Sequence, residues 1–482
     1  MNTSVTRVRS PYRVANPMVA DVLRGHRSAR QRELLRPFVE LGVERPRGQQ
    51  VTWIGDLQQG DGGKGAMTDR LAAVHQFVVR VQGGDNAGHT TVFTHGHGYD
   101  IVVRNHLLPS GLRYPSRIGI IGNGVMVNAE RLAEELDSFA AHTPDIGQRV
   151  FISDRAHLVL PLHRTVDAAQ ERRKQHRSTA IGTTLRGIGP ASVSKINRIG
   201  VRVRDLRDQD LVRDKVADNV EFFGLSRRHV EENLAWLERH RNLLLGRVID
   251  SMRVVNAAVD DGYSVLFEGA QGPLIDIEHG IYPYVTTSPT AFYSVASGSG
   301  VDPSKVTRRI GVLKAYQTMV GNGAFVSEDQ GELGQRLRLV GAEYGATTGR
   351  PRRCGWLDLV HARWAVELNR YTSVVLTKLD VLDGFETIGV CVAYERNDGI
   401  HLGFLPEQDF LADCRPVYRH FAGWLCSTKG LTSYEGLPAA ARVFVDFIAD
   451  YLDVPISAVS KGPRPEDMLV FPDGELGEML AG

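Results

Sequence analysis

From Val51 onward, short runs of β-branched and other apolar residues alternate with segments whose apolar positions recur at helical spacing. Short continuous apolar runs bounded by turn residues are typical of strands buried on both faces. Strands of this kind that alternate with helices predict an α/β fold, a large and mostly parallel sheet flanked by helices. The runs predicted as strands are FVVRV (77–81), RIGIIGNGV (117–125), VFIS (150–153), SVLFEG (264–269), RRIGVLKAY (308–316) and SVVLTKLD (373–380).

Two helices are predicted with particular clarity. Asn128 precedes AERLAEELDSF, whose leucines and phenylalanine share one face, so it is expected to cap that helix. Near the C-terminal end, ARVFVDFIADYL (441–452) carries aromatic and apolar residues at helical spacing. Core packing explains this stripe without any ligand.

Residues 1–50 differ from the rest of the chain. They hold ten arginines, no lysine and four acidic residues, a composition compatible with a transit peptide. RQRELLRPFVELG (30–42) is equally typical of a short surface helix. We expect a peripheral or disordered extension, followed by one domain over residues 51–482, because no long linker interrupts that region.

The charge balance limits the classes of partner. Lysine plus arginine exceed aspartate plus glutamate by 57 to 56, which argues against a broad nucleic-acid or membrane surface but leaves room for a local basic pocket. The four cysteines lack C-x-x-C spacing and are typical of reduced thiols in a cytosolic protein. No run approaches the ~18 apolar residues of a membrane span. We therefore expect a cytoplasmic protein.

A glycine-rich loop, GDLQQGDGGKGAM (55–67), follows the first apolar run. It is not the usual phosphate loop: Gln58 stands where that motif needs its first glycine, and Gly65 where it needs Ser or Thr. Backbone N–H groups of such a loop can still bind an anion, with Lys64 as a point charge. A plain strand-to-helix turn with a solvated lysine explains these residues equally well.

Further polar residues gather after other predicted strands, where parallel sheets bind their ligands. QGGDNAGHTT (82–91), IGTTLRGIGP (181–190) and EGAQG (268–272) offer side chains that could bind a phosphate or read a base edge. GATTGRPRRCGWLD (345–358) brings three arginines within four positions, and arginine forks bind carboxylates bidentately. Structural turns and a surface charge cluster remain the ordinary explanations.

LTKLD (376–380) ends a predicted buried strand with Lys378 and Asp380. A carboxylate in that position can accept both the N1–H and the 2-amino group of guanine, which adenine does not offer, and would therefore select GTP over ATP. SKGPRP (460–465) is a second loop that could close over the purine ring. An ordinary exposed strand end is the alternative.

In their order along the chain, these stretches resemble the adenylosuccinate synthetases from about residue 51 to about residue 470. The resemblance implies a P-loop-NTPase-like ligase architecture with a variant phosphate loop. It also implies a homodimer that uses GTP and Mg²⁺ to join L-aspartate to C6 of IMP in purine biosynthesis, releasing GDP and phosphate. Its most specific segments are QGGDNAGHT, ISDRAHLVLPLHR (152–164), IGTTLRGIGPA, LFEGAQGPLIDIEHGIYPYVT (266–286), TTGRPRRCGWLDLV (347–360) and LTKLDVLDGF (376–385).

The resemblance also implies catalytic roles. Asp61 would take the proton from N1 of the purine and help to hold Mg²⁺, to which Gly88 would give its carbonyl oxygen. His89 would be the acid that stabilises charge while the 6-oxygen attacks the γ-phosphate of GTP, and Lys64 would offset that charge. The aspartate amine then displaces phosphate from the 6-phosphoryl purine.

The binding residues follow position by position from the same resemblance. The substrate nucleotide would contact Asn86, Thr184, Gln271, Thr286 and Arg350, with Arg198 reaching it from the partner subunit. The aspartate carboxylates would contact Thr347, Thr348, Arg350 and Arg352. GTP would contact Gly63, Lys64, Gly65, His89, Thr90, Lys378, Asp380, Ser460 and Gly462.

Several positions depart from the family pattern. Gln59, Gly62 and Ala66 replace Trp, Glu and Lys, and TSPTAFYS (287–294) replaces a segment with two glycines at its end. Asp85 and Met319 stand where the family has His and Arg. These changes are expected to line the monophosphate pocket and its phosphate loop, and predict a divergent member.

Two alternatives follow from those departures. The same chemistry could act on another 6-oxopurine monophosphate, for example dGMP or a modified purine. Alternatively, the chain could be a GTP-binding paralogue without turnover, which the retention of Asp61 and His89 disfavours.

Overall fold

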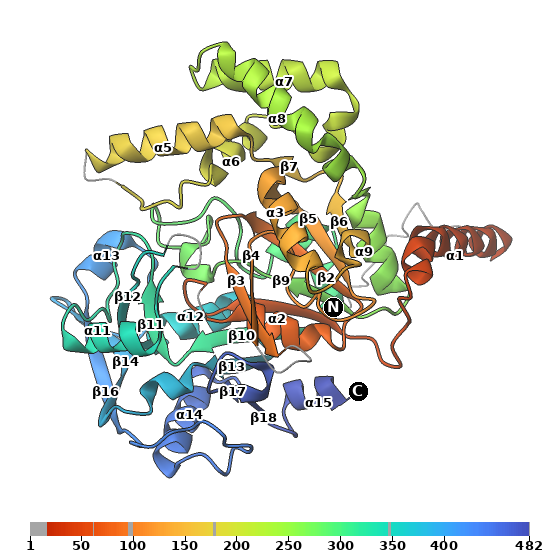
Figure 1. Cartoon of the computed structure of the whole chain (residues 1–482). Coiled ribbons are helices and arrows are strands. Elements are labelled where there is room, and N and C mark those ends of the chain that lie inside the picture. The colour runs from red at the N-terminus through yellow and green to blue at the C-terminus, as the bar shows by residue number, and fades with distance from the viewer. Residues whose placement is uncertain (1–16, 61, 95–99, 177–179, 346–348, 482) are drawn as a thin grey trace, which may run out of the picture.

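A twisted sheet of 11 strands forms the centre of the protein (Figure 1). The computed structural model describes residues 17–60, 62–94, 100–176, 180–345 and 349–481, with side chains from residue 29 onward. Neighbouring strands pair in parallel except the last two, β17 and β18, so the predicted α/β class with a mostly parallel sheet is confirmed. In spatial order the strands are β18 (Met468–Val470), β17 (Ile456–Ser460), β13 (Ser373–Thr377), β10 (Arg308–Lys314), β1 (Val51–Asp56), β9 (Val265–Glu268), β2 (Phe77–Gly84), β5 (Ile118–Val127), β6 (Val150–Ser153) and β8 (Val248–Ile249), with β7 (His157–Leu158) paired to β5.

Helices surround this sheet and form a separate lobe at one end, made by α5 to α8 (Figure 1). The helices are α1 (Pro17–Glu40), α2 (Lys64–Ala72), α3 (Ala129–Ala140), α4 (Ile146–Arg149), α5 (Pro161–Gln175), α6 (Ile188–Ile196), α7 (Gln209–Phe222), α8 (Arg228–Leu245), α9 (Ser251–Asp260), α10 (Ser294–Ser299), α11 (Glu332–Val340), α12 (Leu359–Asn369), α13 (Gln408–Ala412), α14 (Ala439–Leu452) and α15 (Glu475–Ala481), with 3₁₀ turns η1 (Val203–Arg207), η2 (Pro273–Ile275), η3 (Pro303–Lys305), η4 (Leu379–Leu382) and η5 (Pro465–Asp467). None of the helices within the described ranges is long and apolar enough to cross a membrane.

Two smaller β-structures complete the fold. A five-stranded sheet holds β11 (Tyr316–Met319), β12 (Arg353–Asp358), β14 (Thr387–Arg396), β15 (Gly399–His401) and β16 (Arg415–Ala422). A hairpin joins β3 (His89–Thr94) to β4 (Asp100–Asn105). The apolar run 308–316 therefore contains two strand segments rather than one: β10 ends at Lys314, and Tyr316 begins a strand of the second sheet.

The predicted elements form largely where the sequence indicates them. The side chain of Asn128 accepts a hydrogen bond from the backbone of Arg131 and caps α3. On α14, Phe444 and Ile448 are buried in the core, as the aromatic stripe predicts. The strand predicted over 373–380 ends at Thr377, because the next residue has a positive φ and turns the chain into η4.

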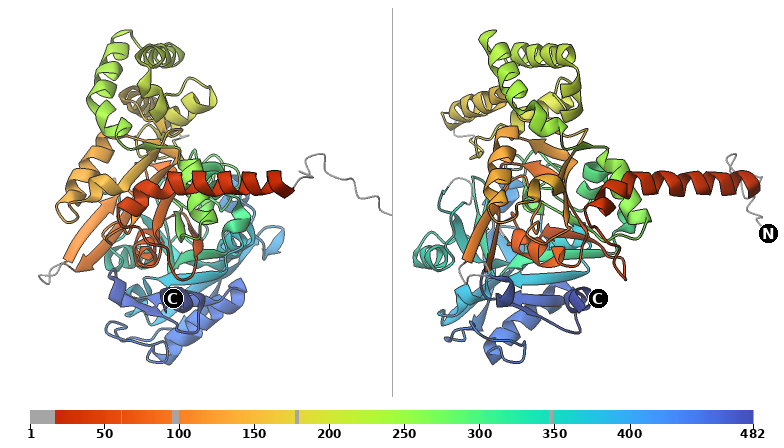
Figure 2. Two further views of the ribbon diagram at one scale, coloured as in Figure 1. Left: turned by 90° about the vertical axis from the view of Figure 1, so that its right-hand side faces the viewer. Right: turned by 45° about the vertical axis from the view of Figure 1, so that its right-hand side comes forward.

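The end of the N-terminal extension belongs to the core, in contrast to the peripheral position expected from its composition. Helix α1 extends away from the body (Figure 2), but Leu35, Phe38 and Val43 are buried in the largest core cluster. The Phe38 ring meets the Phe77 ring edge to face at 5.4 Å. The domain boundary at residue 50 stays a prediction.

We expect the protein to lose stability in acid, because three histidines are buried and a fourth, His157, is partly buried. Burial lowers the pKa of His75, His89 and His163 to about 4 and that of His157 to about 3. The unfolded chain binds protons near pH 6.5 and the folded chain does not, so stability is present above pH 6.5 and falls as the pH drops toward 4. Each fully shifted histidine contributes about 1.4 kcal/mol per pH unit in that window.

Denaturant unfolding between pH 7.5 and 5 measures this loss. The midpoint is expected to fall with pH, and His75→Gln, which replaces a ring bonded to the Leu71 carbonyl and the Thr52 hydroxyl, should reduce the slope. A midpoint that stays level or rises on acidification contradicts the prediction.

Candidate functional site

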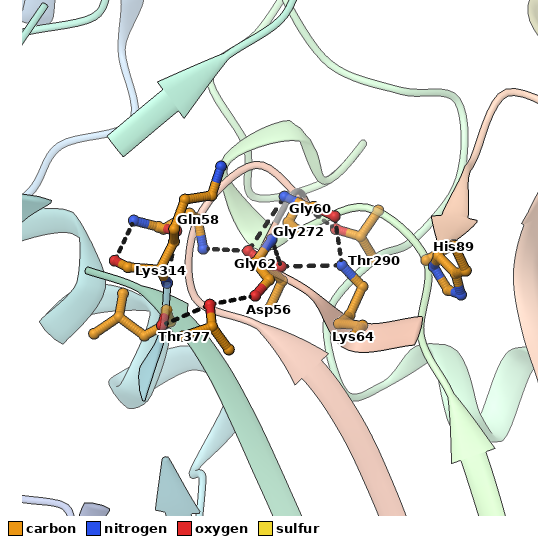
Figure 3. A network of polar contacts seen from close by, with 12 residues as sticks. Asp56, Gln58, Gly60, Gly62, Lys64, His89, Gly272, Thr290, Lys314 and Thr377 are labelled. Atoms are coloured by element: carbon orange, nitrogen blue, oxygen red, sulfur yellow. Dashed lines mark hydrogen bonds and ion pairs between the residues drawn. The ribbon is translucent and has the colours of Figure 1, made fainter. Parts of the chain in front are cut away.

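The glycine-rich loop after β1 is wrapped around the carboxylate of Asp56 (Figure 3). Asp56 is 2% exposed and accepts hydrogen bonds from the backbone N–H groups of Gln58 (2.8 Å), Gly60 (3.2 Å) and Gly62 (2.9 Å). Lys64 Nζ lies 3.0 Å from the same carboxylate and 2.9 Å from the Gly60 carbonyl oxygen. Lys64 is thus fully buried and paired, which contradicts the alternative of a plain turn with a solvated lysine.

Two side chains tie this loop to neighbouring strands (Figure 3). The Gln58 amide accepts from the Lys314 N–H (3.1 Å) and donates to the Tyr316 carbonyl (3.0 Å). Thr377, at the end of β13, donates its hydroxyl to the Gly62 carbonyl at 2.6 Å. The described residues of the loop are therefore held by hydrogen bonds within the chain, and α2 begins beyond them with no side-chain cap hydrogen bond.

Gly62 and Gly65 are required by this packing. A Cβ on Gly62 would lie 2.6 Å from Asp56 Oδ2, and one on Gly65 would lie 2.8 Å from the Cβ of His89. A side chain at position 62 would therefore have to displace the Asp56 carboxylate. Gly65 brings the first turn of α2 against His89.

A cavity of about 250 Å³ opens beside the loop, at the carboxyl ends of β1, β2 and β9. Ligands bind at this edge in parallel α/β sheets. The walls come from several separate segments, which the sheet brings together. The lining residues are Gln59, Gly60, Asn86, Ala87, Gly88, His89, Asp167, Ile181, Gly182, Thr183, Thr184, Ile188, Gly189, Gln271, Ile275, Tyr284, Val285, Thr286, Thr287, Met319, Val320, Asn322, Gly345 and Arg352.

Three side chains on these walls carry buried polar atoms with no hydrogen-bond partner among the described residues. They are Asn86 Oδ1, His89 Nε2 and both amide atoms of Gln271. Buried polar atoms in folded proteins are nearly always paired, so unmatched ones that share a cavity indicate a polar ligand. The positive φ of Gln271 (57°) is a strained conformation of the kind found at functional sites.

His89 forms a buried dyad with Glu268, a residue that the sequence analysis did not select. His89 Nδ1 lies 2.6 Å from Glu268 Oε1, and Arg80 Nη1 lies 4.0 Å from Oε2. Burial raises the pKa of Glu268, but the His89 ring and the Arg80 guanidinium lower it by more. The net pKa of Glu268 is about 2. Burial lowers the pKa of His89. An ionised carboxylate can only accept, so the Nδ1 atom of His89 carries the proton and Nε2 faces the cavity as the basic nitrogen.

Helix α5 holds the loop 181–187, which carries Thr184. Asp167 accepts from the Thr183 hydroxyl (3.2 Å) and the Gly187 N–H (2.9 Å), and Glu171 accepts from the Gly182 N–H (2.7 Å). Thr183 is thus engaged in holding the loop, whereas Thr184 lines the cavity. The two acids, four residues apart on one helix face, were not singled out in the sequence.

A second buried carboxylate, Glu343, joins two of the predicted binding segments. Its oxygens receive Lys314 Nζ and Lys378 Nζ, both at 3.1 Å, together with Arg352 Nη1 and the Tyr316 hydroxyl. Burial raises the pKa of Glu343, but the lysines and the arginine lower it more, and the net pKa lies well below the usual range. Glu343 is therefore a charged residue of the interior.

The predicted guanine residues gather at the ends of two adjacent strands. Lys378 and Asp380 follow β13, and Ser460 and Gly462 follow β17, which pairs with β13 in parallel. Asp380 Oδ1 is buried without a partner among the described residues. Burial, followed by the nearby Asp383, raises the pKa of Asp380. None of the four lines the 250 Å³ cavity.

Among the remaining predicted site residues that the structure describes, all but Gly88 lie apart from the cavity wall. Arg198, at the end of α6, and Arg350 are exposed, as are Gly63 and Thr90. Gly88 lines the cavity. Asp61, Thr347 and Thr348 lie outside the described residues.

Of the changed positions, Phe292 and Tyr293 lie off the cavity wall. Phe292 packs against Trp53, with ring centroids 5.3 Å apart, and under the guanidinium of Arg309. The Tyr293 hydroxyl donates to Asp276 at 2.6 Å. Neither lines the cavity, because the chain turns into α10 here and directs these side chains into the surrounding core.

Of the other departures, Gln59 and Met319 do line the cavity. Asp85 is buried, and its Oδ2 accepts a hydrogen bond from the Asn128 amide at 2.8 Å. Asp85 thus contacts the residue that caps α3.

Comparison with known proteins gives one consistent family. Residues 54–469 match the family model of adenylosuccinate synthetase. The adenylosuccinate synthetase of Thermodesulfovibrio yellowstonii is 42% identical over 421 residues, which cover 86% of this chain and 97% of that protein. That of Helicobacter hepaticus is 42% identical over 422 residues, covering 86% and 98%.

A solved structure of the same family has the same fold. The fully ligated adenylosuccinate synthetase from Plasmodium falciparum superposes with a TM-score of 0.83 at 34% identity, covering 88% of this chain and 100% of that one. The cyanophage S-2L succinoaminodeoxyadenylate synthetase, bound to dGMP and to dATP as an energy donor, gives a TM-score of 0.57 at 21% identity, covering 90% and 99%. The second likeness concerns the fold alone.

Proposed function

The chain belongs to the adenylosuccinate synthetase family and is thus a GTP-dependent ligase that forms a C–N bond between aspartate and IMP, and we infer that the cavity beside the Asp56 loop is its catalytic centre. The unmatched buried atoms of Asn86, His89 and Gln271 carry this inference. A purine monophosphate offers donors and acceptors on its base and ribose that can satisfy them. Thr184 and Thr286 line the same walls and supply hydroxyls.

We propose the following chemistry for this site. The 6-oxygen of a purine is a poor leaving group until GTP phosphorylates it, so Asp61 removes the proton from N1 while the 6-oxygen attacks the γ-phosphate. Negative charge on the phosphoryl oxygens favours a second proton on His89, which Nε2 takes up because Nδ1 already carries the proton bonded to Glu268, and the imidazolium then donates from Nε2 to those oxygens. Lys64 adds positive charge from behind the loop. The aspartate amine then displaces phosphate from C6.

Magnesium fits the residues proposed to hold it. Mg²⁺ usually keeps several waters and binds one or two carboxylates plus substrate phosphates, so the Asp61 carboxylate and the Gly88 carbonyl form a reasonable partial set. No group of three or more His, Cys, Asp or Glu side chains suited to a metal occurs among the described residues, which do not include Asp61. When bound, Mg²⁺ would neutralise charge on the phosphoryl oxygens.

Aspartate is proposed to bind through Thr347, Thr348, Arg350 and Arg352. Arg352 lines the cavity while its Nη1 contacts Glu343, so Glu343 limits the positions that the guanidinium can take. A guanidinium restricted in this way loses less freedom when it binds a carboxylate.

Asp380 is proposed to read guanine, and its replacement should change the nucleotide preference. Asp380→Asn removes one acceptor and adds a donor, which mismatches the 2-amino group of guanine but matches the 2-oxygen of xanthine. We expect kcat/KM for GTP to fall about 10- to 100-fold and that for XTP to rise. Turnover assays with the two nucleotides measure the switch, and an unchanged GTP-to-XTP ratio contradicts the role.

A homodimer with Arg198 acting in trans is proposed from the family and from the surface of α6. Val193 and Ile196 are exposed apolar residues on this helix, at 46% and 79%, next to exposed Arg198. If the site is shared, Arg198→Ala and Asp61→Ala proteins should each be inactive. Mixing them should restore part of the activity, because a hybrid dimer rebuilds one intact site. No recovery in a proven hybrid dimer contradicts action in trans.

Phosphate release from purified protein tests the proposed function. The reaction contains GTP, Mg²⁺ and aspartate, with IMP, GMP or dGMP added separately. Release that requires both IMP and aspartate supports the function. Release only with GMP or dGMP would show instead a ligase that acts on another 6-oxopurine monophosphate. No release with any of the three nucleotides would favour a GTP-binding paralogue without turnover. Because Phe292 and Tyr293 lie outside the cavity, we expect IMP to be the substrate.

A further inference from the structure

Glu343 contacts residues of two substrate-binding segments at once. Oε1 receives Lys378, which begins the proposed guanine segment after β13. Oε2 receives Arg352, which lines the cavity where aspartate is proposed to bind. Glu343 is 0% exposed and the Arg352 side chain 12%, so water screens their contact little, whereas Lys378 is 38% exposed and its contact is partly screened.

The backbone strengthens the same connection. The N–H of Arg352 donates to the Glu343 carbonyl at 3.0 Å, so Glu343 holds both the main chain and the side chain of Arg352. Lys378 Nζ also donates to the Gly341 carbonyl at 2.5 Å, two residues before Glu343. The ammonium group of Lys378 is therefore held by two groups of the chain, while its side chain stays 38% exposed and can still respond to a bound nucleotide.

The charges of the cluster favour a positioning role. One carboxylate faces three cations, Lys314, Lys378 and Arg352, and Lys314 is tied further to the Thr318 hydroxyl at 2.6 Å. The excess positive charge lies beside a cavity that receives anionic substrates. Glu343 thus orients the three cationic side chains, and its single negative charge offsets only part of their positive charge.

We propose that Glu343 is a positioning residue that couples the guanine segment to the aspartate segment, an inference that rests on the proposed function. A guanine nucleotide that orders Lys378 then also favours the arrangement of Arg352 that binds aspartate. Coupling of this kind is reciprocal, so the dicarboxylate must tighten nucleotide binding by the same factor.

Equilibrium binding to the full-length protein tests the proposal. Succinate carries both carboxylates of aspartate but no amine, and GDP lacks the γ-phosphate, so the pair cannot react. Calorimetry measures the Kd of succinate with saturating IMP, with and without GDP. In the wild type we expect GDP to tighten succinate binding about fivefold or more. In Glu343→Gln this ratio should fall to about one.

Glu135→Gln is the matched control. Glu135 is also buried, accepts from the N–H groups of His106, Leu107 and Leu108, and lies on α3, which carries none of the proposed substrate residues. This variant should lose thermal stability while keeping the wild-type ratio. Glu343→Asp keeps the charge but shortens the reach, and serves if Glu343→Gln does not fold; its ratio should also be reduced.

The outcomes separate the inference from the function on which it rests. A folded Glu343 variant with the wild-type ratio, or a wild-type ratio of one, overturns the coupling role even if the enzyme turns over IMP normally. Absence of phosphate release from the wild type with every purine nucleotide overturns the proposed function instead.

Discussion

Replacing His89 with alanine is expected to lower kcat about 10²- to 10⁴-fold while the KM for IMP changes little. The His89 ring lies at the cavity wall, where its Nε2 has no partner among the described residues and its Nδ1 is bonded to Glu268. Nε2 is therefore the one atom of the ring that can transfer a proton to a ligand. Loss of a group that acts mainly in the transition state lowers kcat more than it raises KM. Steady-state phosphate release with saturating GTP and aspartate measures both quantities.

His75→Gln controls for the loss of any buried histidine. His75 is bonded to the Leu71 carbonyl and the Thr52 hydroxyl, does not line the cavity and has no proposed catalytic part. Its replacement should affect stability and leave kcat near the wild-type value. If His89→Ala retains kcat within about threefold of the wild type, His89 is not the acid of this reaction.

Local patterns sufficed for the helices and strands whose signals are complete within a few residues. The cap at Asn128 and the existence of a strand from Ser373, predicted to run to residue 380 but ending at Thr377, each depend on neighbours in sequence. The break between Lys314 and Tyr316 does not depend on sequence neighbours. It arises because β10 joins the large sheet, whereas β11 joins the five-stranded sheet. Residues 35–43 were misjudged for a similar reason: an arginine-rich composition masks three apolar residues that reach the core.

The partners of the site residues were the part that sequence could not supply. Motif spacing identified the loop and Lys64. The burial of Lys64, however, depends on its ion pair with Asp56, which is the last residue of β1. Glu268 likewise ends an apolar strand. A single acidic residue closing a buried strand is a signal that could have drawn attention to both. Glu343 offers no such signal, because its partners come from three separate segments.

Nearness in sequence to a binding segment does not place a side chain in the cavity. Thr286 and Thr287 line the cavity, and Phe292 and Tyr293 follow within six residues, yet their side chains pack elsewhere. A substitution beside a binding segment changes the pocket only if its side chain points into it. Gln59 and Met319 meet that condition and are the departures to examine for substrate preference.

Glu268→Gln is expected to lower kcat about 10- to 100-fold and to shift its pH dependence. The Glu268 carboxylate raises the pKa of the buried His89 ring, against the larger effect of burial. An uncharged amide removes that contribution, so the pKa of His89 falls further and less imidazolium forms at neutral pH. Each unit of pKa costs about a factor of ten in the protonated form. The decline of kcat with rising pH should therefore begin at a lower pH than in the wild type.

The pH profile distinguishes this role from support of the fold. Arg80 is 1% exposed and loses its nearest anion in Glu268→Gln, so the variant should also unfold at a lower temperature, whatever the mechanism. A purely structural Glu268 would lower the amount of active enzyme without moving the pH at which kcat declines. Glu268→Asp keeps the charge and should retain the wild-type profile better than the amide does. A Glu268→Gln profile that superimposes on that of the wild type after scaling would show that Glu268 does not act through His89.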